Sequence, residues 1–104
     1  MTRRPKHEIE ITPDADDHIG ALTARDRATV LDSLVAQLAY EPMVETRNRK
    51  PMRPNPVAPW ELRLGHLRVY FEVEAEPSPM VKILAVGIKE RDKVRIGGKE
   101  LELK

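Results

Sequence analysis

The sequence predicts an α+β fold: an N-terminal strand, two helices and then a three-stranded antiparallel meander, with the helices packed on one face of the sheet. Two patterns lead to this prediction. Apolar residues recur at helical spacing in the first 40 residues, whereas they alternate with polar residues between positions 60 and 73. Helices followed by a run of strands are typical of a sheet covered on one side. At 104 residues the chain fits a single domain, residues 1–104.

The first strand is predicted from "HEIEIT", residues 7–12, in which isoleucine alternates with charged residues. A short helix should follow, because Thr12 is a good N-cap and Pro13 fits the first helical turn. Three aspartates within residues 14–17 favour the positive N-terminal end of that helix. We expect the helix to end near Leu22.

The second helix is predicted to run from Thr23 to about Tyr40. Thr23 and Asp26 resemble a capping box at its start, and the pair Glu41-Pro42 ends it. One face of this helix is apolar and should pack into the core. That face carries Val30, Leu31, Leu34, Val35 and Leu38.

Residues 42–59 are predicted to form a long loop that holds five of the nine prolines. Prolines fix the backbone angle φ and reduce the entropy of the free chain, so this loop should be stiffer than its length implies. Long loops inside a compact domain tend to be functional.

The hairpin is predicted from "WELRLGHLRVYFEV", residues 60–73, where two alternating segments flank Gly65-His66. A two-residue turn fixes the pairing of every residue in both strands. On the face toward the helices Trp60 then pairs with Phe71, Leu62 with Val69, and Leu64 with Leu67. On the other face Arg63 pairs with Arg68, and Glu61 pairs with Tyr70.

The last strand of the meander is predicted from "MVKILAVGI", residues 80–88. It is apolar on both faces except for Lys82, which indicates a central strand covered on both sides. The charged segment "KERDKVR", residues 89–95, follows it directly. The remaining residues, 96–104, are expected to form a last short strand or a frayed tail.

Charge is spread unevenly along this chain, whose net charge is only +1. Between Arg47 and Arg68 six basic side chains stand against one acidic side chain, Glu61. Two arginines directly opposite each other on a strand pair repel, and a phosphate between them would relieve that repulsion. The acidic neighbours Glu61 and Glu72 could do the same, so a phosphate site and a plain surface charge lattice both stay open.

Several kinds of chemistry have no sequence signature here. The chain lacks cysteine, its three histidines have no partner at metal-ligand spacing, and it has no phosphate-binding loop. We therefore expect no metal and no cofactor. The absence of cysteine and of a long apolar segment leads us to expect a cytoplasmic protein that does not contact a membrane.

The order of elements, the hairpin "WELRLGHLRVYFEV" and the strand end "VKILAVGIKERDKVR" together resemble the RelE/ParE toxin superfamily of bacterial type II toxin–antitoxin systems. The resemblance covers nearly the whole chain and implies a toxin whose partner is a small antitoxin. RelE-like members cleave mRNA on the ribosome without a metal, which inhibits translation. ParE-like members share the fold but inhibit DNA gyrase, and an inactive binding module of the same fold is a third possibility.

The resemblance also implies site residues. Arg68 matches the family's arginine on the second hairpin strand, and Arg63 matches a basic position on the first. Lys89 lies where relatives commonly carry arginine, and Arg91 follows two residues later in the same basic run. RNA contacts are expected from the basic loop and the strand end, at Arg47, Arg49, Lys50, Arg53 and Arg95.

Two departures from the family pattern leave the proton-transfer group open. Arg95 stands where RelE-like enzymes have a tyrosine, and Glu61 stands at a usually basic position. Arginine cannot exchange a proton at neutral pH. Glu61 is therefore a candidate general base, with Tyr70 opposite it as a possible helper. His66 in the turn is weighed as a contributor too, although a turn histidine is more often only solvated.

Overall fold

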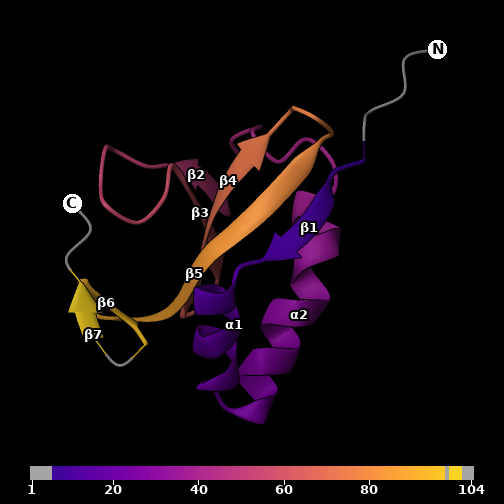
Figure 1. Ribbon diagram of the computed structural model, residues 1–104. Helices are drawn as coiled ribbons and strands as arrows, with labels where there is room; N and C mark the ends of the chain where they lie inside the picture. The colour runs from indigo at the N-terminus through magenta and orange to yellow at the C-terminus, as the bar shows by residue number, and fades with distance from the viewer. Residues whose placement is uncertain (1–5, 98, 102–104) are drawn as a thin grey trace.

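The computed structural model describes residues 6–97 and 99–101, with backbone only for the last three (Figure 1). Strand β1 and two helices come first, and all other elements are strands. The bounds are β1 Glu8–Ile11, α1 Pro13–Gly20, α2 Ala24–Leu38, β2 Arg49–Pro51, β3 Trp60–Leu64, β4 Leu67–Glu74, β5 Met80–Glu90, β6 Lys93–Ile96 and β7 Lys99–Leu101.

The described strands form one sheet in the order β2-β3-β4-β5-β6-β7, and β1 joins it by pairing in parallel with β5. β5 is long enough to hold β1 along its first half and β6 along its last residues, both on the side away from β4. Figure 1 shows α1 and α2 side by side on one face of this sheet. The predicted α+β class, with its meander and one-sided helix layer, is confirmed.

Both helices begin as predicted. The Thr12 and Thr23 side chains accept hydrogen bonds from backbone amides of the first turns of α1 and α2. Thr12 also ties α1 to the sheet, because its backbone and hydroxyl both donate to the carbonyl of Ile83 in β5. This double contact fixes the angle at which the helix layer leaves β1.

The main core lies between the helices and the sheet. Its buried members include Val30, Leu34 and Leu38 from α2 and Leu62, Val69 and Phe71 from the hairpin. Leu31 and Val35 were also predicted to be core, and this is wrong, because they are 45% and 57% exposed. Each lies one residue, or about 100° of rotation, past a buried neighbour, and the sheet is in contact with only a narrow stripe of α2.

The hairpin has the predicted register throughout. Trp60 pairs with Phe71 and Leu62 with Val69 on the helix side, and Arg63 pairs with Arg68 on the other side. The rings of Trp60 and Phe71 stack with their centroids 6.0 Å apart. Gly65 occupies the left-handed region at φ 61°, which a glycine adopts without strain in a tight turn.

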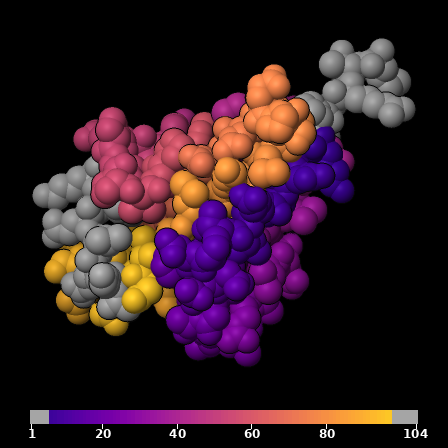
Figure 2. All heavy atoms as spheres, in the orientation of Figure 1, coloured from indigo at the N-terminus to yellow at the C-terminus, as the bar shows by residue number. Residues whose placement is uncertain are grey.

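The second face of the sheet is covered by the proline-rich segment 52–59 and by β6. A smaller apolar cluster there contains Tyr70, Ala85, Ala58, Val94 and Ile96. The prediction that β5 is covered on both sides is therefore confirmed. In Figure 2 this segment, in pink, stands beside the orange β5.

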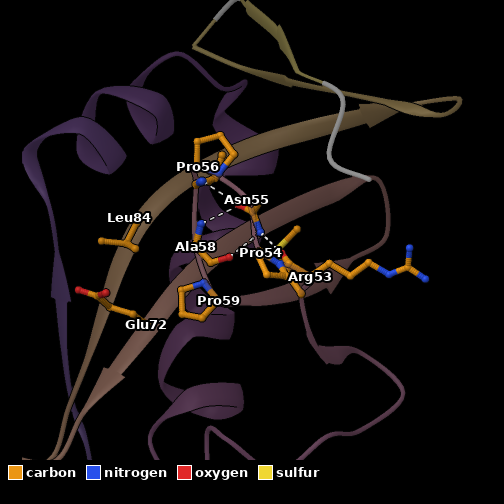
Figure 3. A pocket seen from close by; sticks show the side chains of 10 residues that line it. Arg53, Pro54, Asn55, Pro56, Ala58, Pro59, Glu72 and Leu84 are labelled. Carbon is orange, nitrogen blue, oxygen red and sulfur yellow. Dashed lines mark hydrogen bonds between the residues drawn. The ribbon is translucent and has the colours of Figure 1, made fainter.

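Asn55 holds the proline-rich segment in shape. Its side-chain oxygen accepts hydrogen bonds from the amides of Val57 and Ala58, and its side-chain nitrogen donates to the carbonyls of Arg53 and Ala58 (Figure 3). Proline has no backbone N–H to donate, so the backbone of this segment can form few hydrogen bonds of its own, and the Asn55 side chain supplies them.

The sheet is wider than the predicted meander. β2 forms inside the predicted loop 42–59, and β6 forms from the charged segment 89–95 and the residue after it. β7 pairs with β6 as a hairpin and is the last short strand that was one of the two expectations for residues 96–104. β6 approaches β5 closely at Gly87, where an added Cβ would lie 2.7 Å from the carbonyl oxygen of Arg95. Only a glycine permits this approach.

Candidate active site at the β3–β4 hairpin

Four predicted site residues meet on the hairpin face that points away from the helices. Glu61 and Arg63 come from β3, and Arg68 and Tyr70 come from β4, in the two cross-strand pairs given above. We call these four residues the hairpin cluster. Residues two apart on a strand share a face, so the period of the two strands brings all four side chains together.

Arg68 is only 8% exposed and is held by the turn of its own hairpin. Its Nη1 donates to the carbonyl oxygens of Gly65 at 2.6 Å and Leu67 at 2.8 Å. These bonds lock the guanidinium in one position beside the turn. The buried cation therefore has hydrogen-bonded partners without any ligand.

Arg63 is held differently. Its Nε donates to Glu61 Oε1 at 2.8 Å, while about half of its side chain (47%) stays exposed. Glu61 itself is buried, at 8% exposure. Glu61 and the turn carbonyls thus relieve the repulsion between the two facing arginines. This matches part of the surface charge lattice that was one of the two readings of the sequence. The exposed guanidinium of Arg63 stays accessible to an anion.

Tyr70 is fully buried beneath the proline-rich segment. Burial is the main cause that raises the pKa of its phenol far above the usual value, and the negative charge of Glu61 raises it further. The charges of Arg68 and Arg63 act in the opposite direction and are outweighed. At neutral pH the phenol is therefore neutral and shielded from solvent.

Lys89 extends the basic surface onto β5. Arg68 pairs with Gly87, and Lys89 lies two residues further along the same strand, so Lys89 shares the face of Arg68. The backbone amide of Lys89 donates to the carbonyl of His66 at 2.7 Å, which ties the end of β5 to the hairpin turn. Arg91 is exposed in the β5–β6 turn at a positive φ of 60°.

The residues predicted to bind RNA have varied surroundings. Arg49 Nη1 donates to the carbonyls of Gln37, Tyr40 and Glu41 at 2.9 to 3.3 Å, where α2 ends. Lys50 pairs with Glu45 at 3.2 Å. Arg47 and Arg53 are exposed, and Figure 3 shows the Arg53 side chain extending away from the proline-rich segment. Arg49 therefore closes a helix end, and the other three lie at the surface or near it.

Arg95 lies on the opposite face from the hairpin cluster. It pairs with Ile88, a residue of the helix-side core, whereas its neighbours Val94 and Ile96 belong to the cluster around Tyr70. Arg95 lines a small cavity with His18 of α1. Arg95 therefore does not share a face with Arg63, Arg68 and Lys89, because the alternation of β6 turns it to the helix side, and its RNA contact stays a prediction.

The pairing of His66 with Asp26 has no counterpart among the sequence predictions. His66 Nε2 lies 3.0 Å from Asp26 Oδ2, across 40 positions of the chain. No local pattern signals such a pair, because the first turn of α2 meets the hairpin turn only in the folded protein. A cavity of about 520 Å³ lies beside the two residues.

A second cavity, of about 430 Å³, lies under the proline-rich segment and is bordered by Glu72 and Leu84 (Figure 3). Within residues 6–97, no three His, Asp or Glu side chains gather as a metal-ligand set. In the same part of the chain, neither helix is long and apolar enough to cross a bilayer.

Comparison with known proteins places the fold. No protein-family model and no curated protein matches the chain. A chain of the toxin–antitoxin complex RelBE2 from Mycobacterium tuberculosis matches with a TM-score of 0.71 and 24% sequence identity, over 86% of this chain and 98% of that chain. The fold is RelE-like. The sequence patterns predicted the α+β fold, and the family resemblance implied its RelE-like form.

Proposed function

We propose that this protein is the toxin of a type II toxin–antitoxin pair and cleaves mRNA on the ribosome without a metal. One observation carries the proposal. Arg63, Arg68 and Lys89 lie on one sheet face at the turn end of the hairpin in a RelE-like fold, and Arg63 and Lys89 are exposed there whereas Arg68 is buried. A row of cations at the end of a hairpin suits the phosphate backbone of RNA.

The proposed reaction uses the RNA's own 2′-hydroxyl. Its oxygen attacks the adjacent phosphorus, the bond from phosphorus to the 5′-oxygen breaks, and negative charge grows on the phosphate in between. Fixed guanidinium groups stabilise such charge well. Arg68 offers the donors Nε and Nη2, since the turn carbonyls use Nη1. Arg63 and Lys89 would hold the flanking phosphates.

A second candidate is inhibition of DNA gyrase, as in the ParE-like branch. Glu61 at a usually basic position and the lack of a tyrosine near the end of the chain favour it. The burial of Tyr70 favours it as well, because a fully buried phenol cannot reach a substrate. An inactive binding module of the same fold is the third candidate.

The proposed partner in either toxin reading is a small antitoxin. Residues 46–104 carry 13 basic and eight acidic side chains, so an acidic, flexible antitoxin segment would lie on this half of the chain. Co-expression with the neighbouring reading frame and affinity capture test this. A capture experiment in which no small protein is retained would contradict it.

The deciding experiment is inducible expression in bacteria of the wild type and of Arg63→Ala and Arg68→Ala. Growth, mRNA 5′ ends and the DNA damage response are followed together. We expect growth arrest with new mRNA 5′ ends, both lost in Arg63→Ala, which removes a half-exposed side chain. Arg27→Ala, an exposed arginine on α2, is the matched control and should stay toxic.

Arrest with a DNA damage response and intact mRNA would replace the nuclease reading by the gyrase reading. If the cells contain folded protein and their growth does not stop, the inactive binding module becomes the remaining candidate function. Because Arg68 also holds the turn, thermal unfolding of purified Arg68→Ala must accompany its growth phenotype. A variant that has lost its fold says nothing about the role of the guanidinium.

A further inference from the structure

The proposed cleavage needs a group that accepts the proton of the 2′-hydroxyl, and the hairpin cluster lacks an accessible one. Arginine cannot take this proton. The Glu61 carboxylate is occupied by the hydrogen bond from Arg63 Nε, and Tyr70 is fully buried with a raised pKa. The proton acceptor must therefore come from another part of the molecule. This inference rests on the proposed function, since only RNA cleavage requires such an acceptor.

His66 has the geometry of an oriented base. A carboxylate only accepts hydrogen bonds, so Asp26 Oδ2 at 3.0 Å requires the proton of the imidazole to sit on Nε2. Nδ1 then carries a lone pair, and it makes no hydrogen bond to the residues that the structure describes. The His66 side chain is 55% exposed, so this nitrogen can meet a substrate.

Asp26 is built to hold the imidazole in place. Its side chain is only 17% exposed, and its backbone amide donates to Thr23 Oγ1 at the N-cap of α2. The carboxylate thus comes from the first, capped turn of a 15-residue helix. An aspartate that fixes the tautomer and direction of a histidine is a common support of acid–base catalysis.

The hairpin turn lies between this pair and the three basic residues Arg63, Arg68 and Lys89. Arg68 Nη1 donates to the carbonyl of Gly65, and the amide of Lys89 donates to the carbonyl of His66. Leu64 and Leu67, which also line the cavity beside His66, face the helices, so Asp26 and this cavity lie on the helix side of the turn. The Arg68 guanidinium lies on the other side of the same two-residue turn, and an RNA strand that crosses the tip of the turn meets both. The cavity beside His66 is lined by Arg25, Asp26 and Thr29 of α2, and its volume of about 520 Å³ lies in the range of small-molecule sites.

We propose that His66 is the catalytic base of the cleavage, that Asp26 is its positioning residue, and that the cavity between α2 and the hairpin turn takes a nucleoside next to the scissile phosphate. The proton of the 2′-hydroxyl moves to Nδ1 as the 2′-oxygen bonds to phosphorus. The 5′-oxygen leaves with the electron pair of its bond and takes a proton from water. His66 then releases its proton to water.

The test uses purified protein and a 5′-labelled mRNA on bacterial ribosomes. The variants are His66→Ala, Asp26→Asn and Arg63→Ala, with Asp16→Asn as the control, since Asp16 is an exposed aspartate in the first turn of α1. General base catalysis contributes roughly 10²–10⁴-fold to a rate, so we expect His66→Ala to slow cleavage by about that factor. Added imidazole should restore part of its rate, because the removed ring faces solvent and a cavity.

The dependence of rate on pH separates a base from a structural residue. The charged groups around the imidazole are Asp26 and Arg25 from α2, with Arg68 and Lys89 tied to the turn from β4 and β5. A limb of rising rate in the wild type should vanish in His66→Ala, because this variant lacks the group that takes the proton. Asp26→Asn should slow cleavage but keep a limb, because the imidazole is still present. Asp16→Asn should keep the wild-type profile.

The outcomes separate the role of His66 from the proposed function. Cleavage that is lost in Arg63→Ala but stays within about threefold of wild type in His66→Ala overturns the role of His66 alone. A slow His66→Ala that imidazole does not rescue and that keeps the pH limb overturns it too. A wild type that cuts no mRNA overturns the proposed function and the role of His66 together.

Discussion

Gly87 offers a sharp test of how β6 is seated on the sheet. In a Gly87→Ala variant the new Cβ would lie 2.7 Å from the carbonyl oxygen of Arg95, 2.7 Å from Ile96 Cγ1 and 2.9 Å from Val94 Cγ1. Carbon atoms in contact prefer about 3.5–4.0 Å. The side chains could turn, but the Arg95 carbonyl belongs to the ladder that joins β6 to β5. Relief therefore requires β6 to move.

The size of the effect follows from two opposing contributions. Overpacking of this kind costs typically about 1–3 kcal/mol. Replacing a glycine whose φ is not positive recovers about 0.4–1 kcal/mol by restricting the unfolded chain. The net loss in free energy of unfolding should be about 1–2 kcal/mol, which lowers the melting temperature by roughly 5–15 °C for a domain of this size.

Urea and thermal unfolding of purified protein measure this loss. The matched control is Gly20→Ala, because a Cβ at Gly20 would meet nothing within 4 Å. It should leave stability unchanged or raise it by up to about 1 kcal/mol. A Gly87→Ala protein as stable as the wild type, or more so, would refute the close approach of β6 to β5.

Two further predictions concern Arg49 and Tyr70. Arg49→Ala should lower the free energy of unfolding by about 2 kcal/mol, because three carbonyls at the end of α2 lose a charged donor. Lys50→Ala breaks only an exposed ion pair and should lower it by at most about 1 kcal/mol. Equal losses in urea unfolding would contradict the capping role of Arg49. The pKa of the Tyr70 phenol is raised in the folded protein. Above about pH 10 the phenol of the unfolded chain therefore loses its proton while that of the folded chain keeps it. The free energy of unfolding should then fall by up to about 1.4 kcal/mol per pH unit as the pH rises. Urea unfolding at about pH 9 and about pH 11, on either side of the ordinary tyrosine pKa, should show a smaller fall in Tyr70→Phe, and an identical fall in both proteins would contradict the buried phenol.

Residues 60–73 show how much one local pattern can predict. The period of two, with a turn of Gly65-His66, determines the register of β3 and β4 and the face of every side chain in them. The alternation and the turn are therefore enough to place Arg63 and Arg68 opposite each other. Caps at Thr12 and Thr23 are equally local, because an N-cap involves only its own helical turn.

Burial could not be read from the same patterns. Arg68 and Tyr70 lie on the face of the hairpin that points away from the helices, yet both are buried. Tyr70 is covered by the proline-rich segment and β6. Leu31 has the spacing of a core residue, but the sheet is in contact with a narrower stripe of α2 than the helix offers. Both outcomes depend on contacts between segments far apart in the chain.

The class of fold, the hairpin register and the shared face of Arg63 and Arg68 follow from the sequence alone, because backbone periodicity and turn chemistry act over a few residues. The folded chain is needed to show that Lys89 lies on this face, which of these charges are accessible, that Arg49 binds the carbonyls at the end of α2, and that His66 contacts Asp26. Those facts depend on how the helix layer, the proline-rich segment and the β6–β7 hairpin pack on the sheet. Packing is a property of the whole chain, and no short stretch of the sequence contains it.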